Sequence, residues 1–274
     1  MQRRMTREQL RDKTRQLRVS ILKMLYEAGS GHPGGSLSAI DVMAVLYHNV
    51  MKHDPNNPGW PERDRFFLSK GHACPALYAV LADCGYFSID TLKNLRKYGC
   101  ILQGHPCMRH TPGVEVSAGS LGQGLSIAAG NALAAKLDNK AYRVYCLMGD
   151  GELQEGQIWE AAMTAGHYKL DNLCGIVDYN GLQIDGKVED VMNINPLKEK
   201  WEAFNWNVVE TDGHDVLKLE EAFSRADSCK SKPTVIIAHT VKGKGVSFME
   251  NNPSWHGAAP DKDQLASALA ELGA

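Results

Sequence analysis

The sequence lacks the features that mark membrane, secreted and nucleic-acid-binding proteins. No run approaches the roughly eighteen apolar residues of a transmembrane helix, and the amino terminus has no signal-peptide core. The seven cysteines are odd in number and show no Cys-x-x-Cys spacing, which favours reduced thiols over a disulfide framework, a metal cluster or a redox motif. A formal net charge of -2 argues against nucleic acid as the main partner. We therefore expect a soluble, cytoplasmic protein.

The chain also lacks any segment that would divide it. No Pro-, Ser- or Gly-rich linker, low-complexity stretch or internal repeat interrupts the 274 residues. A chain of this length can bury a large core. We predict a single α/β domain over residues 1–274, with an amino-terminal helix within 1–30 and a loop and helix at 246–274.

A strand–helix–strand pattern lies at the centre of the sequence. An apolar run from Tyr142 to Met148 ends at Gly149-Asp150-Gly151, and a second run, Leu173 to Val177, ends at Asp178-Tyr179-Asn180. The residues between them have a helical pattern that begins directly after the first run, which completes a βαβ unit. Ligands of parallel sheets bind at the carboxyl ends of the strands, so Asp150 and Asn180 are expected to lie close together.

The residue types at these two strand ends predict a metal–phosphate site. A carboxylate and an amide oxygen with open positions suit Mg²⁺ better than zinc. Gly149 and Gly151 allow close approach of a phosphate, and N–H groups at a helix start would face it. A lone Gly-Asp-Gly is usually a turn, but the same triplet after a strand, with Asn180 ending the next strand, is far more specific.

Three histidines occur in glycine-flanked breaks between predicted elements: His32 in SGHPGGS, His72 in SKGHA and His105 in QGHP. Any one of them could be a turn histidine bonded to backbone, but the three together favour a shared site. His214, in a turn after a predicted strand, fits a capping role equally well. The basic loop KGKG at 242–245 could bind phosphate or be solvated. A helix is expected from Thr91 to Tyr98.

A set of motifs, in order and over nearly the whole chain, resembles transketolase. They are SGHPGGS, SKGHA, QGHP, GVEVSAGSLGQG, GDGELQEGQIWEAA, DYNGLQIDG and WHG. The likeness is to the amino-terminal, pyrophosphate-binding subunit of a split transketolase, with Ser120 standing where many members have proline. The resemblance implies the thiamine diphosphate-binding fold, a parallel sheet flanked by helices. It also implies two-carbon ketol transfer from a ketose phosphate to an aldose phosphate, as in the pentose phosphate pathway.

The resemblance assigns the cofactor and metal residues. Thiamine diphosphate would be bound with Mg²⁺, for which Ca²⁺ or Mn²⁺ can substitute. The implied metal ligands are Asp150, Asn180 and the carbonyl of Leu182. The implied cofactor contacts are His72 at the pyrophosphate, the Gly119 carbonyl and the Leu121 side chain at the aminopyrimidine, Gly149, Asp150, the Gly151 N–H, Asn180 and His256.

Catalytic roles are implied for four residues. His32, His105 and His256 would line the substrate channel, contact donor hydroxyls and relay protons, since histidine can donate and accept near neutral pH. Glu155 would join a carboxylate network that links paired active sites, although a plain acid in the first turn of a helix is the alternative.

The resemblance further implies that this chain needs a partner. In the family the cofactor is activated by a glutamate on a pyrimidine-binding domain, whereas Glu152 and Glu155 would lie at the pyrophosphate end. Because the sequence stops soon after its last strand, we expect a separate carboxyl-terminal transketolase subunit, an α₂β₂ heterotetramer and sugar phosphate substrates. The Gly/Ala-rich helix from Gly124 to Leu137 would be buried against other subunits.

Four alternatives remain open. The chain could be the α chain of a 2-oxo acid dehydrogenase, although the two Gly-His-Pro triplets and SLGQG favour transketolase. A deoxyxylulose-phosphate synthase-like enzyme is normally much longer. A two-chain transketolase for an unusual sugar, such as apulose phosphate or a sulfosugar, is consistent with the same motifs. From a different class, the chain could be a non-catalytic, cofactor-binding regulatory subunit, against which the intact Asp150, Asn180 and histidines argue.

Overall fold

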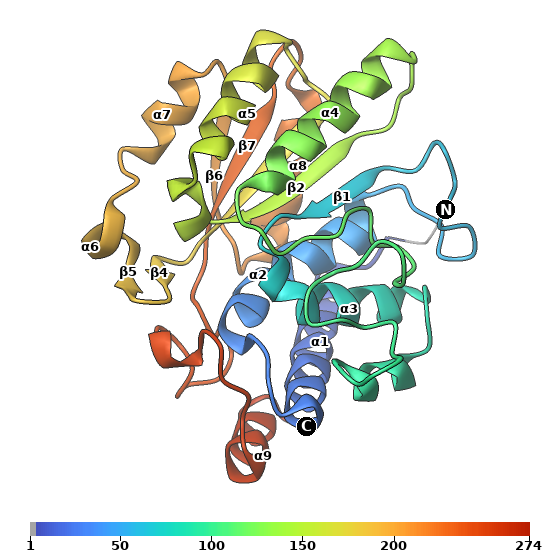
Figure 1. Cartoon of the computed structure of the whole chain (residues 1–274), viewed down its shortest axis with the longest axis vertical. Helices are drawn as coiled ribbons and strands as arrows, with labels where there is room; N and C mark the ends of the chain where they lie inside the picture. Colours follow the sequence, from blue (N-terminus) through green and yellow to red (C-terminus); the bar gives the residue numbers. More distant parts are fainter. Residues whose placement is uncertain (1–3) are drawn as a thin grey trace.

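A five-stranded parallel sheet forms the core of the computed structural model, which describes residues 4–274 (Figure 1). Its strands follow the order β1-β2-β3-β7-β6 and every pairing is parallel. They are β1 (Arg65–Leu68), β2 (Val144–Gly149), β3 (Leu173–Tyr179), β6 (Asn207–Asp212) and β7 (Thr234–His239). The two-residue strands β4 (Leu182–Gln183) and β5 (Gly186–Lys187) form a separate antiparallel pair. The predicted parallel sheet is confirmed.

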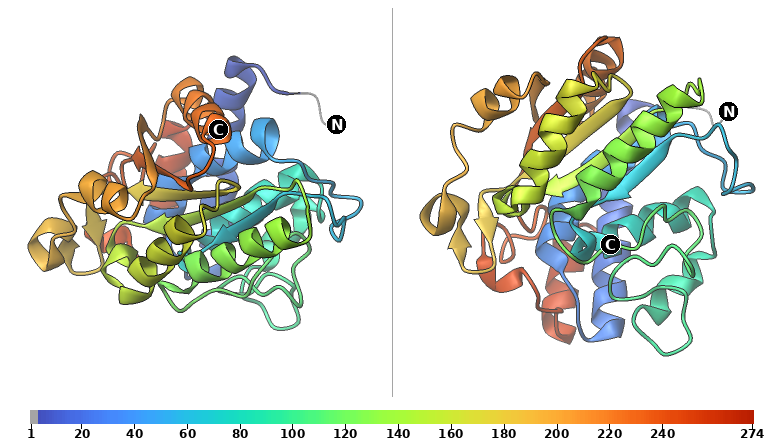
Figure 2. Two further views of the ribbon diagram at one scale, coloured as in Figure 1. Left: turned by 90° about the horizontal axis from the view of Figure 1, so that it is seen from above. Right: turned by 45° about the horizontal axis from the view of Figure 1, so that its top comes forward.

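The sheet is covered on both faces, as Figure 2 shows in its edge-on view. One layer contains α1 (Arg7–Ala28), α2 (Pro33–Val45), α3 (Cys74–Cys84) and α8 (Val216–Ser228); the other contains α4 (Gln123–Leu137), α5 (Gly156–His167) and α7 (Leu197–Ala203). Helix α9 (Lys262–Glu271) lies against α1, and α6 (Val188–Met192) follows β5. Shorter helical turns occupy Leu46–Val50, Gly71–Ala73, Ile89–Asn94, Gly151–Gln154 and Pro253–Trp255.

Burial on both faces explains why the strands read as continuous apolar runs. Along β2, Val144, Cys146 and Met148 contact the α4–α5 layer, while Tyr145 and Leu147 contact the layer of α1, α2 and α8. All five side chains are almost fully buried. The residues that follow this strand are therefore held rigidly at its carboxyl end.

Two predicted helices differ from those observed. The residues around Thr91 to Tyr98 form only the 3₁₀ turn Ile89–Asn94, because Arg96 adopts a left-handed conformation with φ of 64° and its N–H donates to the Leu102 carbonyl. The helix expected directly after Gly151 is split, since Glu155 is extended (ψ 126°) and α5 begins only at Gly156. The amino-terminal helix is confirmed from Arg7 onward, capped by Thr6; residues 1–3 lie outside the described part.

The strand register brings the predicted site residues to one edge of the sheet. Gly149 is paired with Asp178, and Asp178 with Ala238, so the residues after β2, β3 and β7 meet there. The first turn of α2 and the turn after β1 reach the same edge. In the part of the chain that is described, no helix has both the length and the apolar character needed to cross a membrane.

Candidate functional site

The four predicted histidines come together although they are spread from residue 32 to residue 256. The ring centroid of His32 lies 5.3 Å from that of His72, 6.2 Å from that of His105 and 5.5 Å from that of His256. The rings of His72 and His256 are 5.1 Å apart. The glycine-flanked turns thus form one cluster.

All four imidazoles are held in the neutral form. Burial, reinforced by neighbouring positive charges, lowers the pKa of His32 and of His256 to about 4. Burial also lowers the pKa of His72 well below its usual value, and that of His105 less strongly, with Arg96 adding to the effect. A neutral imidazole has one donor and one acceptor nitrogen, so it can both give and take a proton.

Hydrogen bonding distinguishes two nitrogens of the cluster, Nδ1 of His256 and Nδ1 of His32. Lys242 Nζ lies 2.9 Å from His256 Nδ1, and because an ammonium only donates, Nδ1 of His256 is the acceptor and Nε2 carries the hydrogen. His32 Nδ1 is buried and has no hydrogen-bond partner among the described residues. A buried polar atom without a partner is rare and indicates a position for a ligand or water.

The predicted metal ligands lie beside this cluster. Asp150 accepts hydrogen bonds from the N–H groups of Gly151 (2.8 Å) and Gly181 (2.5 Å), which confirms that it lies next to Asn180. The amide oxygen of Asn180 accepts from the Leu182 N–H at 3.1 Å, and the Leu182 carbonyl accepts from Lys242 Nζ at 3.0 Å. The Gly151 N–H assigned to phosphate therefore bonds to Asp150 in this arrangement.

The surroundings of Asp150 disfavour the ionised form of its carboxyl group. It is 2% exposed, and burial together with the neighbouring charge of Asp178 raises its pKa to about 6. A cation bound here would reverse this effect. Among the described residues, no group of three or more His, Cys, Asp or Glu side chains could hold a metal, so a metal here would depend on amide and carbonyl oxygens as well.

Two buried lysines belong to the site, and neither was singled out as a site residue from the sequence. Lys242, 2% exposed, lies in the KGKG loop whose role was left open; burial, with Lys70 next, lowers its pKa to about 8. Lys70, also 2% exposed, forms a salt bridge with Asp178 and donates to the Gly35 carbonyl at 3.2 Å. Its position directly after a buried strand was a usable signal.

Asp178 organises the strand end behind the site. Besides Lys70, its carboxylate accepts hydrogen bonds from Ser38 (2.6 Å), Thr240 and the side-chain amide of Asn180 (3.2 Å). Burial alone would raise its pKa, but Lys70 and the hydroxyl donors outweigh that and lower it, so the side chain is ionised. The orientation of Asn180 is thus linked to a fully buried ion pair.

Glu152 ties three of the recognised motifs together. Its carboxylate accepts from the Ser69 hydroxyl, the Gly122 N–H (2.8 Å) and the Gly149 N–H (3.0 Å). The side chain is 2% exposed, and burial raises its pKa. Sequence reasoning placed it only at the pyrophosphate end, because its partners are separated from it by up to 83 residues.

Two glycines beside the cluster lie where a side chain would crowd neighbouring atoms. A Cβ atom at Gly35 would lie 3.3 Å from His72 Nε2 and 3.4 Å from Lys70 Nζ. At Gly71 it would meet the backbone of Ala118 and Gly119 at 2.9 to 3.0 Å, which explains the close approach of the two loops. Gly35 therefore allows α2 to approach the nitrogen atoms of His72 and Lys70 closely.

The remaining predicted residues lie at the rim. Gly119 is exposed beside His105, and Leu121 is half-buried. Glu155 is exposed, lies against Gly122 and forms no side-chain hydrogen bond or ion pair with another described residue. The structure therefore places Glu155 outside the histidine cluster.

Comparisons with known proteins identify the family. Residues 8–274 match the family described as "Transketolase, thiamine diphosphate binding domain". The chain belongs to the transketolase family. It superposes on a transketolase from Campylobacter jejuni with a TM-score of 0.92 at 37% identity, covering 96% of this chain and 42% of that one.

Two relatives of similar length are single subunits of larger enzymes. The chain is 47% identical over 256 residues to the 6-deoxy-6-sulfo-D-fructose transketolase subunit SqwG of Clostridium sp. (strain MSTE9), covering 93% of each. It is 44% identical to one subunit of the apulose-4-phosphate transketolase of Phocaeicola vulgatus, covering 93% of this chain and 90% of that one. It is also 44% identical to human transketolase, but spans only 42% of that protein's length.

The family description names thiamine diphosphate, and the residues at the site fit its diphosphate and a metal ion bound with it. Asp150, Asn180 and the Leu182 carbonyl offer only hard oxygen ligands, and the buried Asp150 has an electrostatic need for a cation. The ammonium groups of Lys242 and Lys70 suit the negative charge of a diphosphate. The fit therefore holds for the metal and for the phosphates.

Proposed function

We propose that this chain binds Mg–thiamine diphosphate and acts as the pyrophosphate-binding subunit of a two-chain transketolase. One observation carries the proposal: Asp150, Asn180 and the Leu182 carbonyl lie beside a cluster of four neutral histidines at the carboxyl edge of the sheet. This is the place where ligands bind in open parallel sheets. Thiamine diphosphate would supply the electron sink for two-carbon transfer.

The metal and diphosphate would be held by this chain. Asp150 and Asn180 provide side-chain oxygens and Leu182 a carbonyl oxygen for Mg²⁺. An ammonium and a divalent cation repel each other, so Lys242 would leave the Leu182 carbonyl when the metal binds and turn towards the phosphate oxygens. His72, which lies next to Gly35 and Lys70, would donate to the same phosphates.

The other histidines would handle the substrate. His32, His105 and His256 are neutral because burial and nearby cations lower their pKa values. Neutral imidazoles can donate to a sugar hydroxyl and accept its proton as the carbon–carbon bond breaks. The unpartnered Nδ1 of His32 is the atom we assign to such a contact.

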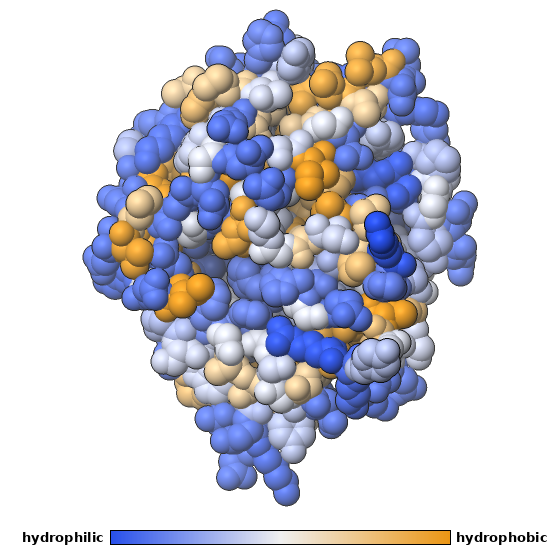
Figure 3. Space-filling model, viewed as in Figure 1, coloured by the Kyte–Doolittle hydropathy of each residue, from blue (hydrophilic) through white to orange (hydrophobic). Residues whose placement is uncertain are grey.

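The rim of the site and the outer face of α4 and α5 support a partner subunit. Ile127 and Leu137 on α4 and Met163 on α5 are exposed, and Figure 3 shows apolar atoms gathered over the α4 side of the molecule. Glu155 lies at the start of this helix pair. We propose that a carboxyl-terminal transketolase subunit with the pyrimidine-binding domain covers this face, giving a cytoplasmic α₂β₂ heterotetramer in which Glu155 links the active sites.

Reconstitution tests the proposal. The purified chain alone should show no ketol transfer at any thiamine diphosphate concentration, and a carboxyl-terminal subunit encoded nearby should restore it. The measurement is transfer from a ketose phosphate to an aldose phosphate by the mixed subunits. Full activity from the single chain would refute the two-chain assignment, and no activity with any partner would favour a regulatory role.

An unusual sugar is the second candidate substrate. The two relatives of similar length are subunits of enzymes named for such sugars, 6-deoxy-6-sulfo-D-fructose and apulose 4-phosphate. The ordinary pentose phosphates are the alternative. A panel of these donors with the reconstituted enzyme separates the two, because the true donor should have the highest kcat/KM. Turnover of a 2-oxo acid instead would point to a dehydrogenase subunit.

A further inference from the structure

The loop that carries Lys242 is anchored by residues outside the proposed cofactor site. The Val241 N–H donates to His214 Nε2 at 2.8 Å, on one side of Lys242. On the other side, the Gly243 N–H donates to the Gly34 carbonyl at 3.0 Å, and Arg18 Nε donates to the Lys244 carbonyl at 2.9 Å. The backbone is therefore held immediately before and after the lysine.

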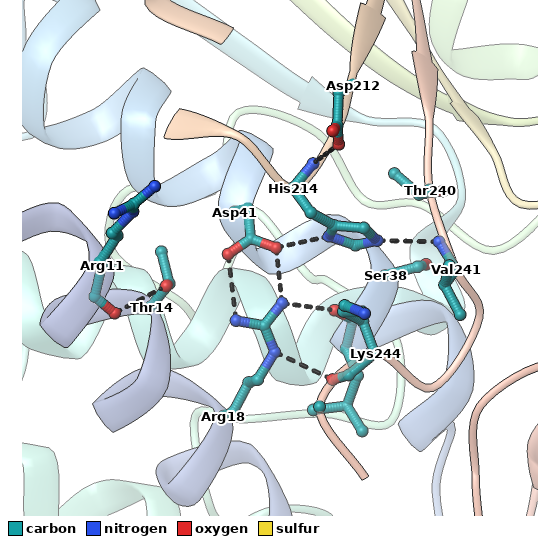
Figure 4. A network of polar contacts seen from close by, with 12 residues as sticks. Arg11, Thr14, Arg18, Ser38, Asp41, Asp212, His214, Thr240, Val241 and Lys244 are labelled. Atoms are coloured by element: carbon teal, nitrogen blue, oxygen red, sulfur yellow. Dashed lines mark hydrogen bonds and ion pairs between the residues drawn. The ribbon is translucent and has the colours of Figure 1, made fainter. Parts of the chain in front are cut away.

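His214 is fixed in one tautomer by its two partners. Because the Val241 N–H donates to Nε2, this nitrogen has no hydrogen, and Nδ1 carries the hydrogen that is donated to Asp41 at 2.7 Å. Figure 4 shows the imidazole between the carboxylate of Asp41 and the backbone of Val241. Asp41 therefore fixes the position of the imidazole, and the imidazole fixes the position of the Val241 backbone.

Asp41 is itself rigidly held. It is 3% exposed and accepts two hydrogen bonds from Arg18, at 3.0 and 2.5 Å (Figure 4). Burial alone would raise its pKa, but Arg18 and His214 outweigh that and lower it, so the carboxylate is ionised. Arg18 belongs to α1, Asp41 to α2, and His214 precedes α8, so three helices of one layer converge on this loop.

We propose that His214 and Asp41 are positioning residues that set the location of the Lys242 ammonium and thereby the affinity for the cofactor's diphosphate. This rests on the proposed function, because Lys242 acts there on the phosphates. Neither residue touches the histidine cluster: His214 bonds to Asp41 and Val241, whereas the cluster consists of residues 32, 72, 105 and 256. Their effect on binding passes through the loop.

A double-mutant cycle tests whether His214 acts through Lys242. The probe is Mg²⁺ with inorganic pyrophosphate, titrated by calorimetry into the full chain and into His214→Phe, Lys242→Met and the double variant. Each single substitution should weaken binding about tenfold, equivalent to about 1.4 kcal/mol. If His214 acts through Lys242, the double variant should bind about as weakly as Lys242→Met alone. A loss near one hundredfold, the product of independent effects, would overturn the proposal.

A second readout needs no ligand. Hydrogen–deuterium labelling of the backbone amides at 241–244, measured by mass spectrometry, should be severalfold faster in His214→Phe, because the Val241 N–H loses its acceptor and the loop is released. His239→Gln is the matched control, since His239 ends β7 and its exposed imidazole hydrogen-bonds only to Glu210 among the described residues. Its labelling should equal that of the wild type. Unchanged amide labelling of the loop in His214→Phe would contradict the proposal.

The two readouts separate this proposal from the proposed function. If the wild-type chain binds no Mg-pyrophosphate, the cofactor assignment fails, while labelling still decides whether His214 positions Lys242. If His214→Phe does not fold, His214→Ala replaces it, because alanine can neither donate to Asp41 nor accept from the Val241 N–H. Equal labelling of His214→Ala and wild type would then overturn the positioning role.

Discussion

Removing Lys70 should destabilise the fold through the charge it leaves behind. Lys70 and Asp178 are 2% and 0% exposed, and each is the other's only oppositely charged contact among the described residues. Breaking a buried pair on one side costs about 3–5 kcal/mol. Because Ser38, Thr240 and Asn180 still donate to Asp178, we expect Lys70→Met to lie at the lower end, about 3 kcal/mol.

The assay is urea unfolding of Lys70→Met, Asp178→Asn and the double variant, which together give the coupling energy. The double variant buries no unpaired charge, so it should be more stable than Lys70→Met. Lys140→Met is the control: Lys140 pairs with Glu62 with both side chains more than 40% exposed, and such pairs contribute about 0–1 kcal/mol. A cost below about 1 kcal/mol for Lys70→Met, or strictly additive effects, would refute the reasoning.

Three further predictions concern the histidines and one glycine. His105→Ala should lower kcat/KM for ketose donors in the reconstituted enzyme with thiamine diphosphate affinity retained, and His72→Ala should mainly weaken the cofactor; equal effects on both constants would contradict these roles. Burial lowers the pKa of His32 to about 4 in the folded chain, against about 6.5 in the unfolded chain. The unfolded state therefore binds more protons in this range, so the free energy of unfolding should fall as pH drops from about 6.5 to about 4. Urea titration should show a shallower fall for His32→Gln. Gly124→Ala should cost about 1–3 kcal/mol of unfolding free energy, since its Cβ would lie 2.4 Å from the Ser69 side chain; an unchanged midpoint would oppose this.

Residue type and strand position together predicted which side chains lie close together at the strand ends. Asp150 and Asn180 follow buried apolar runs, and the register of β2 and β3 brings these strand ends together. His32, His72 and His105 follow the same logic, because glycines flank each of them where a regular element breaks. The parallel sheet followed from apolar runs that are buried on both faces.

Side chains whose partners are distant in sequence could not be predicted. The partners of Glu152 include Ser69 and Gly122, so the sequence indicated only that this residue lies at the pyrophosphate end. His214 is 173 residues from Asp41, and no local pattern indicates that pairing. Arg96 ended a predicted helix through a left-handed conformation that its residue type does not favour.

Calorimetric titration of thiamine diphosphate into the purified chain, with Mg²⁺ and with chelator, tests the central claim most directly. We predict Mg²⁺-dependent binding in the wild type, none in Asp150→Asn, and intermediate binding in Asn180→Ala, because only Asp150 brings a charge to the metal. Asp185→Asn, an exposed acid on the turn between β4 and β5, should bind like the wild type. Undiminished Mg²⁺-dependent binding by Asp150→Asn would contradict the account.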